Sequence, residues 1–189
     1  MTSSRHVIDA FAAEFARYRG LAEKSTAQIA WEDLRVALVP ETNSIAAIMK
    51  HIAGNLQSRW TDPFTTDGEK PWRNRDAEFI DDFESREALL DTWARGWAPL
   101  DSLLSTCSDA DLARPLLIRS EPHTLARALA RSVAHTSYHV GQIVQAARIL
   151  ASRAGTPWST LTIPRGGSAS FNAEMDHYAR QPESPPPTP

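Results

Sequence analysis

Apolar residues recur at three- and four-residue intervals in four long stretches of the chain, and this period is that of an amphipathic helix. The stretches run from Ser4 to about Ala30, from Ser44 to about Thr61, from Glu84 to about Thr106 and from Thr124 to about Ser152. No stretch of comparable length alternates with the period of a strand. The pattern therefore predicts an all-α protein, a four-helix bundle.

Each predicted helix has an apolar side that should face the core. In the first two helices this side holds Val7, Ile8, Phe11, Phe15, Tyr18, Leu21, Ala22, Ile45, Ile48, Met49, Ile52, Leu56 and Trp60. In the last two it holds Leu89, Leu90, Trp93, Trp97, Leu100, Leu103, Leu104, Leu125, Leu129, Val133, Val140, Ile143, Val144, Ala147 and Leu150. Ser3 or Ser4 is placed to cap the first helix, and Asn43 or Ser44 the second.

The segment from Asp62 to Asp82 contains several turn-forming pairs and no helical period, so it is predicted to be a loop. Loops of about twenty residues in a compact domain are usually functional or disordered. Trp72 and Phe79 favour an ordered loop that packs back on the body. A link of this length could also run along a whole helix, so the second and third helices could be parallel.

Shorter elements complete the predicted domain. A helical turn is expected near Leu34, an extended hairpin from Leu116 to Leu125, and a last helical turn from Phe171 to about Tyr178. We expect a single helical domain over residues 1–178, with a C-terminal extension from about 153. Residues 179–189 are rich in proline and are predicted to be a disordered tail.

Composition restricts the function. A net charge of −3 without a basic block gives no reason to expect a nucleic-acid partner. No apolar run approaches the length of a membrane span, and the polar start lacks a signal-peptide core, so we expect a cytoplasmic protein with no membrane contact. The only cysteine, Cys107, is interpreted as a buried thiol rather than a nucleophile, since no histidine lies near it in sequence.

The candidate chemistry begins with His135 and His139, which are four residues apart on the last predicted helix. Side chains at this spacing lie on one helical face, so both imidazoles could reach one metal ion. With six histidines in the chain, about 0.2 such pairs are expected by chance. Two structural histidines bonded to nearby polar groups therefore remain the alternative.

A third ligand is available on the second helix, because ligands in a bundle come from facing helices. His51, Asn55 and Arg59 form a row along the edge of that helix's apolar side. Three imidazoles suit zinc, nickel, iron or copper and leave an open coordination position, as in catalytic sites. Thr136 stands where a zinc protease of the His-Glu-x-x-His type has its glutamate, so that mechanism is disfavoured.

These residues resemble the DinB/YfiT-like superfamily of metal-dependent bundle proteins, in which the second helix supplies one histidine and an H-x-x-x-H on the fourth supplies two. The match falls on His51, His135 and His139 and covers about Phe11 to Leu150. Within the superfamily the chain is similar to an uncharacterised bacterial branch, through segments 43–46, 54–60, 67–70, 73–76, 139–142 and 163–168.

The resemblance implies an up-down-down-up bundle, often a homodimer, that holds one divalent metal. The imidazole ligands make zinc, nickel or iron the candidate metals. Better understood relatives use the metal to activate a low-molecular-weight thiol. The expected function is therefore a metal-dependent transferase or hydrolase for a small-molecule substrate. The alternative is a non-catalytic metal- or ligand-binding module related to stress, or a purely structural dimer.

Several polar residues could contact the metal ligands or the substrate. Asn55, Arg59 and Gln142 are the first candidates, with ordinary solvated helix residues as the alternative. Arg73, Arg75 and Asp76 in the long link could close over the cleft, and so could Arg165, although surface solvation explains the charged link nearly as well.

Overall fold

The computed structural model describes residues 4–179, and it divides into two compact units, Met1–Pro157 and Trp158–Pro189. The first unit contains the bundle, and the second contains one helix, α6 (Ser168–Ala179). This helix includes the turn predicted near Phe171. The disordered tail predicted for residues 179–189 lies outside the described residues from 180 onward.

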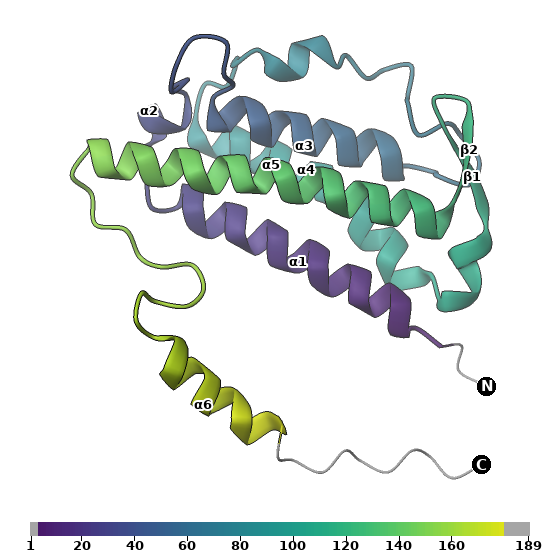
Figure 1. Ribbon diagram of the computed structural model, residues 1–189. Helices are drawn as coiled ribbons and strands as arrows, with labels where there is room; N and C mark the ends of the chain where they lie inside the picture. Colours follow the sequence, from purple (N-terminus) through teal and green to yellow (C-terminus); the bar gives the residue numbers. More distant parts are fainter. Residues whose placement is uncertain (1–3, 180–189) are drawn as a thin grey trace. The chain divides into compact units, whose positions relative to one another are not determined.

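Four long helices build the first unit: α1 (His6–Thr26), α3 (Ile45–Trp60), α4 (Arg86–Thr106) and α5 (Leu125–Arg153). In Figure 1, α3 and α4 run in one direction, and α1 and α5 run in the other. The closest partners are α3 with α4 and α1 with α5, whereas α3 meets α5 over a smaller area. The predicted all-α, up-down-down-up bundle is thus confirmed, with its middle pair parallel.

Side chains cap three of these helices. The hydroxyls of Ser44, Ser85 and Thr124 each accept a hydrogen bond from the backbone N–H three residues on, at 3.2 Å. Helix α1 is different, because its N-cap residue, Arg5, makes no side-chain cap and Ser4 bonds elsewhere. The predicted cap by Ser4 is therefore wrong, and Ser3 lies outside the described residues.

Asp109, about a hundred residues away in the 3-10 helix η2 (Asp109–Ala113), caps α1 instead. Its Oδ1 accepts from the backbone N–H groups of Val7 and Ile8 at 3.1 and 3.0 Å. A tertiary contact of this kind leaves no local trace in the sequence, so capping patterns could not reveal it.

The bundle core consists of the predicted apolar sides, and its largest fully buried side chains include Trp60, Trp97, Met49 and Leu100. A Cβ added at Gly96 of α4 would overlap Ala53 of α3, so this glycine lets the parallel pair approach closely. Two predicted core residues are wrong: Val7 is 45% exposed and Leu90 is 39% exposed. Both lie at the border of their helix's apolar side, where the helical period does not decide burial.

The long link after α3 is ordered and returns along that helix, as the top of Figure 1 shows. It holds the 3-10 helix η1 (Asp76–Phe79), and it is bonded to α3 near both ends. Ser58 Oγ donates to the Gly68 carbonyl at 2.9 Å, and Lys50 Nζ donates to the Ile80 carbonyl at 3.0 Å. Trp72 does not anchor the link as predicted, because it is 56% exposed.

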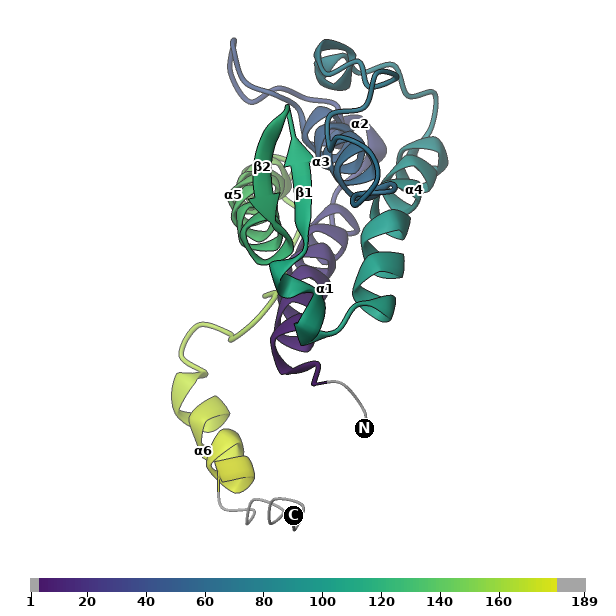
Figure 2. The same cartoon turned by 90° about the vertical axis from the view of Figure 1, so that its right-hand side faces the viewer.

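The predicted hairpin is present as β1 (Pro115–Ile118) and β2 (Glu121–Thr124), which pair antiparallel with Leu116 opposite His123. Figure 2 looks at the bundle from the end where this hairpin lies, beside the start of α5. The short helix α2 (Trp31–Leu34) matches the turn expected near Leu34. Within residues 4–179, no helix is both long enough and apolar enough to span a membrane.

Asp67 fixes the hairpin turn to the link. Arg119 and Ser120 form the turn with φ angles of 54° and 62°, a left-handed conformation that side chains other than glycine rarely adopt. The Asp67 carboxylate accepts from the backbone N–H groups of Glu69, Arg119 and Ser120 at 2.7, 2.8 and 2.6 Å. Burial alone would raise the pKa of Asp67, but these hydrogen bonds outweigh burial and lower that pKa.

Candidate metal centre

The three histidines selected from the sequence lie together where α3 faces α5. Each offers one ring nitrogen within 4.8 Å of the other two. The ring centroids are 4.7 to 5.2 Å apart, and His51 Nε2 lies 3.2 Å from His135 Nε2. His51 is buried, whereas His135 and His139 are half-buried. The cluster therefore sits at the surface of the core, with one side open.

Two of the imidazoles are oriented by a partner on their other nitrogen. His51 Nδ1 lies 2.8 Å from Glu78 Oε2, and His139 Nδ1 lies 2.8 Å from Gln142 Oε1. Carboxylate and amide oxygens accept hydrogen bonds, so the proton of each ring is assigned to Nδ1. The lone pair on Nε2 then faces the cluster, as in the histidine ligands of known metal sites.

Glu78 reaches His51 from η1 because α3 leaves room for it. A Cβ added at Gly54, three residues after His51, would overlap the Glu78 carboxylate. Arg73 Nε and Nη2 donate to the same carboxylate at 2.7 and 2.9 Å, and both side chains are almost completely buried. Burial raises the pKa of Glu78, but the hydrogen bonds from His51 and Arg73 outweigh it and lower that pKa. Glu78 is therefore an ionised acceptor at neutral pH.

Burial keeps the other two histidines neutral. Burial first, and then the neighbouring His139 and His51, lower the pKa of His135 to about 3. Burial also lowers the pKa of His139, although its bond to Gln142 opposes this shift. Neutral imidazole is the form that coordinates a metal, so these residues are ready to bind one near pH 7.

The donor set fits a divalent cation. Two imidazole nitrogens bound to one tetrahedral zinc ion are about 3.3 Å apart, from bond lengths near 2.05 Å. The observed separation of 3.2 Å between His51 and His135 is close to this value. The remaining nitrogen of His135, Nδ1, is buried and has no hydrogen-bond partner among the described residues. The same 3.2 Å separation also fits a hydrogen bond between the two neutral rings, so this distance is compatible with a cation and does not by itself require one.

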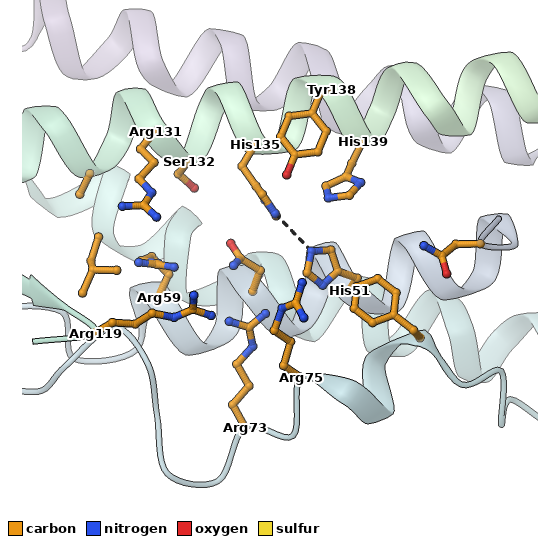
Figure 3. A pocket seen from close by; sticks show the side chains of 15 residues that line it. His51, Arg59, Arg73, Arg75, Arg119, Arg131, Ser132, His135, Tyr138 and His139 are labelled. Atoms are coloured by element: carbon orange, nitrogen blue, oxygen red, sulfur yellow. Dashed lines mark hydrogen bonds between the residues drawn. The ribbon is translucent and has the colours of Figure 1, made fainter. Parts of the chain in front are cut away.

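The open side of the cluster faces a cavity of about 370 Å³, which is in the range of small-molecule sites. Figure 3 shows its lining: the three histidines at one end, with positively charged arginines from α3, α5, the link and the hairpin turn. These are Arg59, Arg73, Arg75, Arg119 and Arg131. Within residues 4–179, the residues that line this cavity include no aspartate or glutamate.

The polar residues predicted from the sequence differ in whether they line the cavity. Asn55 and Arg59 line the cavity and are 9% exposed, rather than solvated on the helix edge. Gln142 contacts His139 instead of the cavity. Arg73 and Arg75 also line the cavity.

Sequence reasoning missed Glu78, Arg119 and Arg131. Arg131 lies four residues before His135, so extending the histidine row by one turn would have found it. Gly54, a glycine within a helix, was the available signal for a close neighbour such as Glu78. Arg119 depends on the fold of the hairpin and had no signal.

Comparisons agree with this fold. The family described as "Protein of unknown function (DUF1572)" matches residues 2–167. A structure of a conserved protein from Enterococcus faecalis is 20% identical, with a TM-score of 0.59, over 77% of this chain and 98% of that one. A DinB-like protein from Bacillus cereus ATCC 10987 is 16% identical, with a TM-score of 0.56, over 81% and 96%. No curated protein matches the chain.

Proposed function

We propose that this chain, which belongs to the DUF1572 family and has a fold similar to that of a DinB-like protein, is a metal-dependent enzyme that acts on a small molecule. In this proposal His51, His135 and His139 hold one divalent cation through Nε2. The observation that carries it is the joint orientation of the rings. Glu78 and Gln142 bind the outer nitrogens, and the inner nitrogens face a cavity of substrate size.

A divalent cation held by three imidazoles would supply Lewis-acid chemistry, and it would lower the pKa of a coordinated water or thiol. The chain's own contribution is to orient the ligands and to exclude competing groups. Glu78 and Gln142 fix the ring protons on the outer nitrogens of His51 and His139. Asn55 and Ser132 offer uncharged polar groups along the cavity wall, where they could position a substrate.

The lining favours one reaction class over another. Hydrolysis commonly uses a nearby carboxylate as a general base, and no described residue of the cavity wall supplies one. Transfer of a low-molecular-weight thiol to an electrophile has no such requirement. We therefore place thiol transfer ahead of hydrolysis, with zinc, nickel or iron as the candidate metals.

A second candidate is a binding module without turnover, and the same lack of a general base favours it. The two candidates differ in a direct assay. An enzyme would consume a thiol and an electrophile in a metal-dependent reaction, whereas a binding module would take up a ligand unchanged. The homodimer expected from the resemblance is a further prediction, which light scattering tests.

Metal content tests the proposal. Elemental analysis of the purified chain should find about one divalent metal ion per chain. His135→Ala should lose it and any turnover of thiol with an electrophile such as 1-chloro-2,4-dinitrobenzene. His6→Ala is the matched control, because His6 is exposed and lies outside the cluster. Full metal content in a folded His135→Ala protein would refute the assigned ligands.

A further inference from the structure

Arg59 is a buried cation without a partner. It is 9% exposed, and its Nη1 is fully buried with no hydrogen-bond partner among the described residues. Burial, and then the charges of Arg131 and Arg73, lower the pKa of Arg59 to about 10, so it still carries its charge at neutral pH. Buried charges in proteins are normally paired, and an unpaired one is costly.

Three neighbouring arginines have the hydrogen-bond or ion-pair partners that Arg59 lacks. Arg73 is bonded to both Glu78 and Glu69, and Arg119 is bonded to Glu69 at 3.2 Å. Arg131 lies 4.0 Å from Glu121, and its Nη1 lies 3.4 Å from Nε2 of the buried His123. Among the described residues, there are thus three contacting carboxylates against five guanidinium groups, and none of these carboxylates forms an ion pair with Arg59, although the charge of Glu69 acts on it from a longer distance.

A histidine and an arginine stand at the same spacing on α3 and on α5. On α3, His51 and Arg59 are eight residues apart, and on α5 His139 and Arg131 are eight residues apart, so each row is about 12 Å long. Because α3 and α5 are antiparallel, the histidines meet at one end and the arginines at the other. In Figure 3, Arg59, Arg119 and Arg131 gather away from His135 and His139.

We propose that the arginine end of this cavity binds the anionic group, phosphate or carboxylate, of the small molecule whose reacting group lies at the histidine end. Arg59 is the main anchor, and Arg131 and Arg119 bind from the rim. A guanidinium pairs with either anion through two parallel hydrogen bonds. The anion supplies the contacting counter-charge that Arg59 lacks among the residues that the structure describes. The inference rests on the proposed function only for the position of the reacting group.

A purely structural role for Arg59 predicts the opposite behaviour in a variant. A structural arginine stabilises the fold, so its removal should destabilise the protein. An arginine kept for a ligand is an uncompensated charge in the free protein, so replacing it with an apolar side chain of similar length should raise the melting temperature.

Calorimetry on the full-length, metal-loaded protein tests the proposal with three probes of similar size: phenyl phosphate, phenylacetate and benzyl alcohol. At least one anion should bind, more weakly as salt concentration rises, and the neutral alcohol should bind at least about tenfold more weakly. The two anions distinguish a phosphate site from a carboxylate site. Equal binding of all three probes, or binding of none, would overturn the proposal.

The second part of the test uses the Arg59→Met variant. It should weaken binding of the anion about tenfold or more, raise the melting temperature without ligand, and leave one metal ion per chain. Arg148→Met is the matched control, since Arg148 is exposed on α5 and does not line this cavity. A lower melting temperature for Arg59→Met with unchanged anion binding would show a structural arginine and overturn the proposal.

The two proposals fail separately. Anion binding that depends on Arg59 in a protein without a metal site would refute the proposed function and leave the anion site intact. A metal that depends on His135 in a protein that binds no anion would do the reverse.

Discussion

The two ends of the cavity differ in whether their buried charged side chains have partners. At the histidine end, the buried carboxylate of Glu78 is bonded to His51 and Arg73, so each charge has a partner within the chain. At the arginine end, the buried Arg59 guanidinium forms no ion pair with any residue that the structure describes, and Glu69 acts on it only from a longer distance. The first end is organised in advance around its ligand atoms. The second end lacks a counter-charge until an anion binds, and this difference separates the proposed metal centre from the proposed anion site.

The largest expected effect comes from removing the partner at the histidine end. Glu78→Ala leaves the buried Arg73 guanidinium without its main counter-charge and frees the outer nitrogen of His51. Breaking a buried pair in this way should cost about 3–5 kcal/mol of unfolding free energy. Chemical denaturation measures the loss, and Arg148→Ala, at an exposed position, is the control. A loss below about 1 kcal/mol would show that the pair does not stabilise the link.

At the arginine end, hydrogen bonds from the hairpin turn to the Asp67 carboxylate stabilise the structure, and they contribute less than the buried Glu78 ion pair. Asp67→Ala removes the acceptor of three backbone N–H groups and should cost about 2 kcal/mol. Because Arg119 stands on this turn, anion binding should also weaken, while metal content stays unchanged. Denaturation, calorimetry and elemental analysis measure the three quantities. Loss of metal from a folded Asp67→Ala protein would contradict the separation of the two ends.

Gly54→Ala acts on the histidine end without removing a charge. The added methyl group overlaps the Glu78 carboxylate and should push it away from His51. Loss of a partner of this kind typically weakens metal affinity about tenfold, or about 1.4 kcal/mol. Competition with a chelator measures the affinity. Gly141→Ala is the matched control, because a Cβ at Gly141, also within a helix, meets nothing within 4 Å. Equal affinities in the two variants would contradict the role of Glu78.

The smallest expected effect is the pH dependence of stability without metal. The folded pKa of His135, about 3, lies below its unfolded value of about 6.5, so the unfolded chain binds a proton that the native protein excludes. Stability should therefore fall as pH drops below about 6.5, by about 1 kcal/mol between pH 6.5 and 5.5 from His135, with a further loss from His139. The lowered pKa of Glu78 acts only below its unfolded value of 4.5, outside this interval.

Denaturation curves of wild type and His135→Gln across this interval measure the effect. The variant should show a smaller pH slope, and His6→Gln, at an exposed position, should keep the wild-type slope. A slope unchanged in His135→Gln would show that this histidine is not held neutral.

The helical period predicted the four helices, their order and nearly all of the core, because packing in a bundle repeats every turn. The same period brought His51, His135 and His139 to facing edges. Arg131 was within reach of this reasoning. Glu78 was not, since its position depends on how a link of about twenty residues returns along α3. The cap of α1 by Asp109 was hidden for a similar reason, as both groups come from distant segments.

X-ray diffraction from crystals of the full-length protein, recorded on both sides of the absorption edge of the metal found by elemental analysis, tests the central claim most directly. The account predicts one anomalous peak, bound by Nε2 of His51, His135 and His139, with Glu78 and Gln142 on the outer nitrogens of His51 and His139. A peak at other residues, or three ordered imidazoles bonded to each other with no peak between them, would contradict it.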